Sequence, residues 1–149
     1  MRRLILVLAT LPIAGLPLVA GDARAACTVD TQPVAFGVID VTQTTESRGE
    51  IALSCSITTN VLVGLASASA PPGQRSMAGT NGRRLTYELY TDASRTAAWG
   101  DGNGAGAAVP ANNVGEDTRR LTIYGEVPRQ DPVPAGDYTD SLTVVISFQ

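Results

Sequence analysis

The chain of 149 residues contains no histidine and no lysine, so all 11 of its basic residues are arginines. Without histidine it cannot form a Ser-His-Asp or Cys-His catalytic site, and it lacks the commonest ligand of zinc and copper. A net charge of −3 without lysine argues against nucleic-acid binding, which needs clustered cations to neutralise phosphates. Charged residues make up only 17% of the chain, whereas 15 glycines and 9 prolines punctuate it. This composition is typical of a turn-rich, all-β protein.

Residues 1–26 have the layout of a cleaved secretory signal peptide. Arg2 and Arg3 precede a mostly apolar stretch over residues 4–20, and Ala23-Arg24-Ala25 supplies a small-residue cleavage site. A membrane anchor is one alternative, because the apolar stretch is about as long as the shortest transmembrane helices, but its two prolines favour cleavage. A lipoprotein is another alternative, although Arg24 stands where a lipoprotein signal needs an aliphatic residue.

Cleavage removes three arginines and one aspartate, which leaves eight arginines and thirteen acidic residues in a mature domain over residues 27–149. Its net charge is therefore −5, and we expect no membrane span in it. Export places Cys27 and Cys55 in an oxidising compartment, where we expect them to form one structural disulfide. A redox-active pair is the alternative, but the C-x-x-C spacing is absent.

Alternation of apolar and polar residues with period two predicts short strands separated by turns. Within residues 50–57, Cys55 shares a face with Ile51 and Leu53, so we expect the disulfide to be buried. Glycine, proline and asparagine cluster between the alternating segments, and a long loop is predicted over residues 99–113. These features predict an antiparallel β-sandwich. The predicted strands lie within residues 34–38, 50–57, 61–65, 85–89, 121–123 and 138–149, with a weaker candidate at 96–99.

No segment matches a metal, cofactor or catalytic site closely enough to predict one. Asp101-Gly102-Asn103-Gly104 opens like a calcium-binding loop, but Ala105 and Asn112 stand where further oxygen ligands are needed. The same glycines fit a relaxed dinucleotide pattern, yet no parallel strand and helix flank them. Asp137 and Asp140 are interpreted as solvated turn charges, because a domain this small has little room for a sugar-sized cleft between carboxylates. We expect no metal and no cofactor.

Aromatic side chains are the remaining candidates for ligand contact. Trp99, Tyr90 and Tyr124 are expected to be exposed and to offer a stacking surface to a carbohydrate. Tyr87 shares the face of the leucines on either side of it and is expected in the core.

A series of short segments follows in order along the mature chain. They are Cys27-Thr28-Val29, Val34-Ala35-Phe36-Gly37, Gly49-Glu50-Ile51, Ser54-Cys55, Arg75-Ser76-Met77, Leu85-Thr86-Tyr87-Glu88-Leu89-Tyr90-Thr91-Asp92, Trp99-Gly100-Asp101, Leu121-Thr122-Ile123-Tyr124-Gly125, Val127-Pro128, Ala135-Gly136-Asp137-Tyr138-Thr139-Asp140 and Leu142-Thr143-Val144-Val145-Ile146. Each segment is weak alone. Together they resemble the spore coat protein U domain, which is shared with subunits of archaic, Csu-type chaperone–usher pili, and the resemblance covers essentially the whole mature chain.

The resemblance implies an immunoglobulin-like β-sandwich that lacks its last strand. In that family a periplasmic chaperone fills the resulting groove, and an outer-membrane usher exchanges the chaperone strand for one from the next subunit. Unpaired N–H and C=O groups beside apolar pockets invite this addition of a strand. The residues that the resemblance places on the terminal strand beside the acceptor groove are Leu142, Val144, Ile146 and Phe148.

One feature departs from the pilus-shaft members of that family. A shaft subunit needs an N-terminal extension of alternating residues to donate a strand, whereas Ala26 alone separates the predicted cleavage site from Cys27. We therefore expect a subunit that accepts a strand without donating one, as a tip or terminal subunit does.

The predicted function is that of an exported, non-enzymatic structural or adhesive subunit of a surface pilus or coat. It would pass through the periplasm to the cell surface, with the chaperone, the usher and other subunits as its partners. Two other classes stay open. One is a self-contained carbohydrate-binding sandwich that uses Trp99 and exposed tyrosines, and the other is a small secreted hydrolase that uses carboxylates.

Overall fold

The computed structural model describes residues 24–103 and 106–149, so the predicted signal peptide lies outside it apart from residues 24–26. No helix in the described ranges is long and apolar enough to cross a membrane. The strands are β1 (Cys27–Gln32), β2 (Thr45–Cys55), β3 (Thr59–Ser67), β4 (Ser76–Gly79), β5 (Arg84–Thr86), β6 (Glu88–Tyr90), β7 (Val109–Val114), β8 (Arg119–Val127), β9 (Tyr138–Thr139) and β10 (Leu142–Phe148). All pairings between the strands β1 to β10 are antiparallel, which confirms the predicted all-β class.

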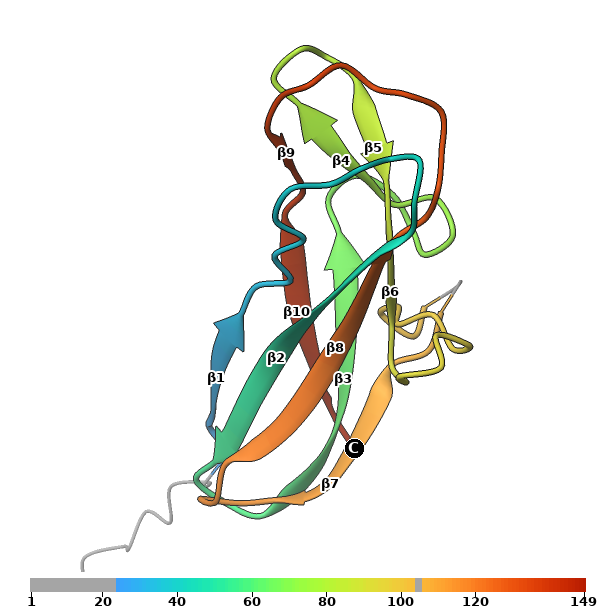
Figure 1. The fold of residues 1–149 in the computed structure, drawn as a ribbon. Helices are drawn as coiled ribbons and strands as arrows, with labels where there is room; N and C mark the ends of the chain where they lie inside the picture. The colour runs from blue at the N-terminus through green and yellow to red at the C-terminus, as the bar shows by residue number, and fades with distance from the viewer. Residues whose placement is uncertain (1–23, 104–105) are drawn as a thin grey trace, which may run out of the picture.

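Two sheets form the layers of a sandwich, one with the order β1-β2-β8-β6 and the other with the order β10-β3-β7. Figure 1 shows them one behind the other, with the small sheet β5-β4-β9 at the upper end. Alternate residues of β2 and β3, such as Ile51, Leu53, Val63 and Leu65, are at most 1% exposed. The alternation that predicted these strands therefore marks the side chains that fill the space between the layers.

The strand predicted over residues 34–38 is wrong, because this segment is an irregular crossing that follows β1. Val34 and Phe36 are half-buried and pack against the inner face of the first sheet at Gly49 and Gly125. A Cβ on Gly125 would lie 2.5 Å from Val34 Cγ1 and 2.9 Å from Phe36 Cζ, and one on Gly49 would lie 2.8 Å from Val34 Cγ2. The apolar alternation here comes from two side chains that fill the space above these glycines.

Other strand boundaries also differ from the prediction. The segment 85–89 is divided at Tyr87 into β5 and β6, and the candidate at 96–99 forms isolated bridges. Strand β7 occupies the end of the predicted loop over 99–113, and β2 ends at Cys55, which leaves Ile57 42% exposed. Strands β1 and β4 were not predicted, because β1 is almost wholly exposed and β4 has four residues, so neither shows a strong alternation.

Replacing Gly125 with alanine is expected to lower the free energy of unfolding by about 1–3 kcal/mol, because the new methyl group overlaps Val34 and Phe36. Gly136→Ala is the matched control, since the nearest heavy atom to its ideal Cβ is Asn81 Nδ2 at 3.4 Å. We expect the control to change stability by less than about 0.5 kcal/mol. Denaturant unfolding of both variants measures the difference, and equal stabilities would contradict the packing of Val34 and Phe36.

Candidate functional site

A cavity of about 320 Å³ opens between β1 and β10, on the side of the sandwich where the two layers are not joined. Thr31 and Gln32 of β1 line one wall, and Leu142 and Val144 of β10 line the other. Its floor is the core itself, including Leu89, which is fully buried. We call the space between β1 and β10, with this cavity as its deep part, the groove.

The four apolar residues predicted for the terminal strand lie in β10 and face the interior. Val144 and Ile146 stand opposite Leu65 and Val63 of β3, which are 1% and 0% exposed, and directly opposed residues share a face. Nevertheless, β10 itself is only half-covered, and Phe148 is 53% exposed. Leu142, Val144, Ile146 and Phe148 thus form one apolar row on β10, and Leu142 and Val144 of this row line the cavity. That the whole row contacts an incoming strand stays a prediction.

Strand β1 shows the same incomplete cover on the opposite wall. Val29 stands opposite Leu53, which is 0% exposed, yet Val29 is 37% exposed. Thr31 stands opposite the fully buried Ile51 and is also exposed. Since opposed residues share a face, the inner face of β1 is open to solvent.

The outer edge of β10 carries unpaired backbone groups. Within the described residues, β3 is the strand neighbour of β10, and their register runs without a shift over seven residue pairs. The sequence of β10 contains no charged residue, glycine or proline. Long, flat, apolar edges of this kind pair readily with another chain, and proteins usually protect them.

The edges of β6 and β5 already form hydrogen bonds with other parts of the chain. Along β6, the backbone N–H of Trp99 donates to the carbonyl of Leu89 at 2.8 Å. Along β5, the side-chain amide of Gln130 accepts from Thr86 N at 2.9 Å and donates to Thr86 O at 3.0 Å, as a neighbouring strand would.

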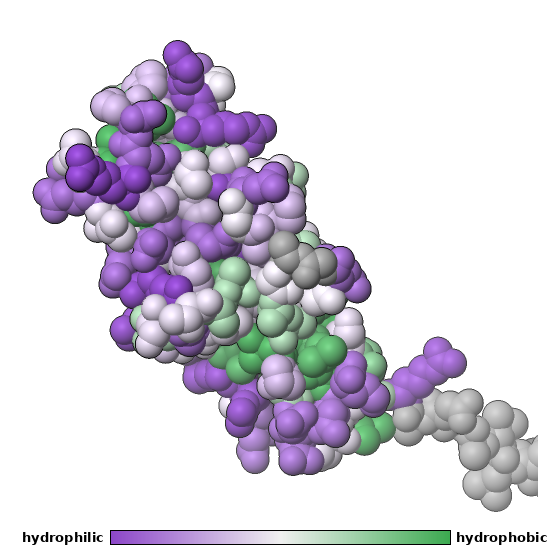
Figure 2. All heavy atoms as spheres, turned by 90° about the vertical axis from the view of Figure 1, so that its right-hand side faces the viewer, coloured by the Kyte–Doolittle hydropathy of each residue, from purple (hydrophilic) through white to green (hydrophobic). Residues whose placement is uncertain are grey.

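Strand β7 is an edge with irregular backbone. Pro110 has no N–H to donate, and Asn113 has a φ of 54° beside a register shift in the β3–β7 pairing. Figure 2 looks at this side of the molecule and shows apolar side chains gathered in its lower half. The backbone of β7 is nevertheless less suited to strand addition than that of β10.

Trp99 does not form an exposed ligand contact, so that prediction is wrong. Its side chain is 1% exposed, and its indole Nε1 donates to the carbonyl of Val63 at 2.9 Å. The buried guanidinium of Arg75 donates to the carbonyls of Leu65 and Trp99 at 2.9 and 2.7 Å and pairs with Glu88 at 2.7 Å. These contacts give the carbonyls of Val63 and Leu65 hydrogen-bond partners on the side of β3 that faces away from β10.

Tyr90 and Tyr124 stand opposite each other on the outer face of the first sheet and are half-buried. The guanidinium of Arg48 lies over the ring of Tyr124, 5.2 Å from its centroid. Burial raises the pKa of Tyr90, and the carboxylates of Glu126 and Glu88 raise it further. Arg48 therefore already covers one face of the Tyr124 ring. Contact of Tyr90 and Tyr124 with a ligand stays a prediction.

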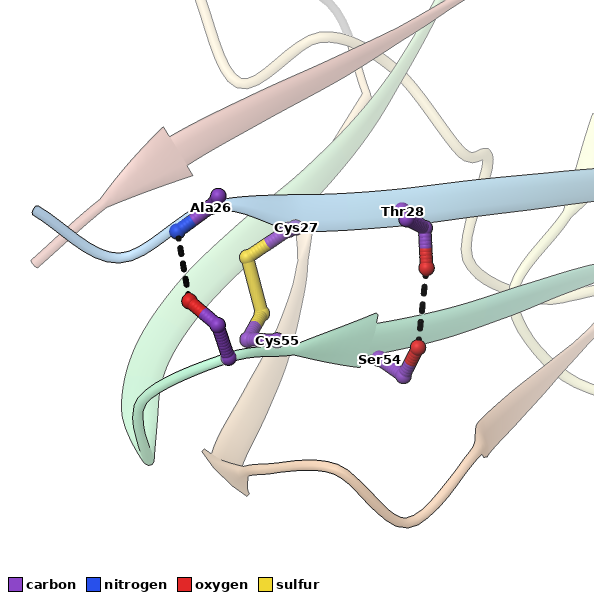
Figure 3. Close-up of a disulfide and its surroundings, with 6 residues drawn as sticks. Ala26, Cys27, Thr28, Ser54 and Cys55 are labelled. Carbon is purple, nitrogen blue, oxygen red and sulfur yellow. Dashed lines mark hydrogen bonds between the residues drawn. A yellow bond between two sulfur atoms is a disulfide. The ribbon is translucent and has the colours of Figure 1, made fainter.

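The predicted disulfide joins Cys27 at the start of β1 to Cys55 at the end of β2, as Figure 3 shows. Cys55 is 2% exposed, as expected, whereas Cys27 is half-buried. Beside the disulfide, the hydroxyls of Thr28 and Ser54 lie 2.9 Å apart in a hydrogen bond. Because the rest of β1 is exposed, this covalent tie helps to hold one wall of the groove on the sandwich.

Asp140 lies at the upper end of the groove and is more than a solvated turn charge, so its predicted role is wrong. Its Oδ2 accepts from Tyr87 OH at 2.6 Å, from Ser69 Oγ at 2.9 Å and from Ser67 Oγ. Burial raises the pKa of Asp140, but these hydrogen bonds outweigh it and leave the pKa below its ordinary value. Burial and the bond to Asp140 raise the pKa of Tyr87, whose ring lies in the core as predicted. No sequence pattern links Asp140 to partners more than 50 residues away.

The calcium-like segment is a turn in the part that the structure describes. The carboxylate of Asp101 accepts the backbone N–H of Asn103 at 2.9 Å. Over the described ranges, no three histidine, cysteine or acidic side chains gather closely enough to hold a metal ion.

Fold and groove together define an immunoglobulin-like β-sandwich with an unprotected sheet edge beside an apolar groove. A family model for the Spore Coat Protein U domain matches residues 14–145. The chain belongs to this family. It is 30% identical over 108 residues to Protein U of Myxococcus xanthus, an alignment that covers 67% of this chain and 59% of that protein. The chain thus spans about three fifths of the length of this relative.

A solved structure with a similar fold is that of the CsuC–CsuE chaperone–tip adhesion subunit pre-assembly complex, from the archaic chaperone–usher Csu pili of Acinetobacter baumannii. The match covers 84% of this chain and 40% of the chain in that structure, with a TM-score of 0.55 and 23% sequence identity. At this identity the likeness concerns the fold.

Replacing Cys55 with serine is expected to lower the free energy of unfolding by about 2–5 kcal/mol, because the disulfide closes a long loop of a small domain. Ser54→Ala is the matched control, since it removes only the exposed hydrogen bond to Thr28. Denaturant unfolding in oxidising buffer compares the two variants with the wild type. Unchanged stability of Cys55→Ser would show that the disulfide does not hold the fold together.

Proposed function

We propose that this chain is a non-enzymatic subunit of a chaperone–usher pilus or coat and that it works by accepting a β-strand along β10. The observation that carries the proposal is the unpaired edge of β10 beside an apolar groove. A strand added there would pair its backbone with β10 and place alternate side chains between the two sheets. The family and the fold similarity to a chaperone–subunit complex support this role.

The size of the cavity supports the proposal that another chain fills it. If a cavity of 320 Å³ were closed and empty, its cost would be on the order of 8 kcal/mol, at about 24 cal/mol per Å³. The total stability of a typical domain is about 5–15 kcal/mol. In the open groove, apolar side chains remain in contact with water instead. An incoming strand therefore gains free energy from burial as well as from backbone hydrogen bonds.

The proposed occupants follow one another. A periplasmic chaperone fills the groove first, and at the outer-membrane usher a neighbouring subunit replaces it. This sequence requires export, for which residues 1–26 are the proposed signal peptide. That the subunit accepts a strand without donating one stays a prediction. The carbohydrate-binding alternative is weakened, because the buried Trp99 is unavailable for stacking.

Strand peptides test the proposal directly. A peptide with four apolar residues at alternate positions is expected to raise the thermal midpoint of the purified mature domain, because a ligand that binds the folded state stabilises it. A peptide of the same composition, with its apolar residues made contiguous, is the control and should have little effect. Titration followed by fluorescence or calorimetry gives the dissociation constant.

Phe148→Ala is expected to weaken peptide binding about tenfold, since it removes an apolar contact at the lower end of the groove. Ile57→Ala is the matched control, because Ile57 is similarly exposed but lies outside β1 and β10. The proposal fails if the domain is fully stable alone and binds neither a strand peptide nor a chaperone of its own export pathway.

A further inference from the structure

The apolar row of β10 ends in a charged group. Beyond Leu142, the carboxylate of Asp140 points inward to the buried Tyr87, and both residues line the cavity. The cavity continues past Asp140 to Tyr138 and Thr139. A strand that fills the whole cavity therefore extends beyond Leu142 and passes Asp140.

The two oxygens of Asp140 are unequally satisfied. Oδ2 accepts three hydroxyl hydrogen bonds, whereas Oδ1 accepts one bond, from the backbone N–H of Ser141 at 2.9 Å. A carboxylate has about four acceptor positions, two on each oxygen, so Oδ1 retains one for a further donor. None of the ion pairs in the described residues involves Asp140, whose negative charge is held by hydrogen bonds.

We propose that the strand that fills the groove carries a side-chain hydrogen-bond donor at the position opposite Asp140, two residues beyond the one opposite Leu142. This inference rests on the proposed strand-acceptor function. An added strand covers Asp140 and removes water from Oδ1, and the lost hydrogen bond has to be replaced. Cross-strand neighbours have Cβ atoms about 4.5–5.5 Å apart, within reach of a hydroxyl, amide or cationic side chain.

The groove therefore distinguishes occupants by chemistry as well as by shape. Four alternate positions along the incoming strand take apolar side chains, and the next position in the same row takes a donor. Tyr87 lies at the polar end of the groove and contacts both of its walls. Its ring packs edge-on against Phe36, which follows β1, with ring centroids 6.3 Å apart. Its hydroxyl donates a hydrogen bond to Asp140, which precedes β10. The polar end can fix the register in which a strand is accepted.

Peptides that differ by threonine or valine test the proposal, because these side chains have the same shape and only threonine donates. Each peptide carries the four apolar residues, with the test residue two positions beyond them at either its N-terminal or its C-terminal end. At the end that meets Asp140, the threonine peptide is expected to bind the wild-type domain about five- to tenfold more tightly than the valine peptide. At the opposite end the two should bind alike. Threonine placed opposite Leu142 should weaken binding.

Asp140→Ala is expected to abolish the preference for threonine, whereas Tyr87→Phe, which leaves Oδ1 unchanged, should retain it. If Asp140→Ala does not fold, the comparison of threonine and valine peptides on the wild-type domain still tests the inference. Equal binding of threonine and valine peptides at both ends overturns this inference and leaves the acceptor function intact. A domain that is fully stable alone and binds neither any of these peptides nor a chaperone of its own export pathway overturns the acceptor function itself.

Discussion

Strand β10 forms backbone hydrogen bonds with β3 along one side and leaves its other side unpaired within the described residues. Buried backbone groups need partners, and an apolar edge strand is prone to pair with other chains. The sandwich is therefore open along one side, and the cavity, the half-buried apolar row and the exposed β1 all lie at that opening. The proposed function uses this opening as its binding site.

The rest of the chain restricts pairing to that side. Trp99 and Arg75 donate to backbone carbonyls of β3, and Gln130 takes the place of a strand beside β5. Pro110 lacks an N–H that β7 could donate. The disulfide of Cys27 holds the exposed β1 beside β2, so the groove keeps two walls without an occupant. The edges of β5, β6 and β7 are thus less suited to strand addition than that of β10.

The parts of the fold that depend on local alternation were predictable from the sequence. The inward row of β10 and the burial of Cys55 follow from period-two patterns that the structure reproduces. Contacts between distant residues were not predictable. Trp99 sits among glycine, alanine and asparagine, but its indole bonds to Val63, 36 residues earlier in the chain. Phe36 fills space left by the distant Gly125, so the apolar alternation around it predicts a strand that the structure does not form.

Residue-resolved hydrogen exchange tests most directly whether β10 is the accepting edge. In the free domain, we expect rapid exchange at the β10 amides that do not donate to β3. A bound strand peptide or chaperone should protect these amides strongly while leaving the edge amides of β7 unchanged. Protection of all β10 amides in the free domain, or protection that appears on β7 instead, would contradict an open acceptor edge at β10.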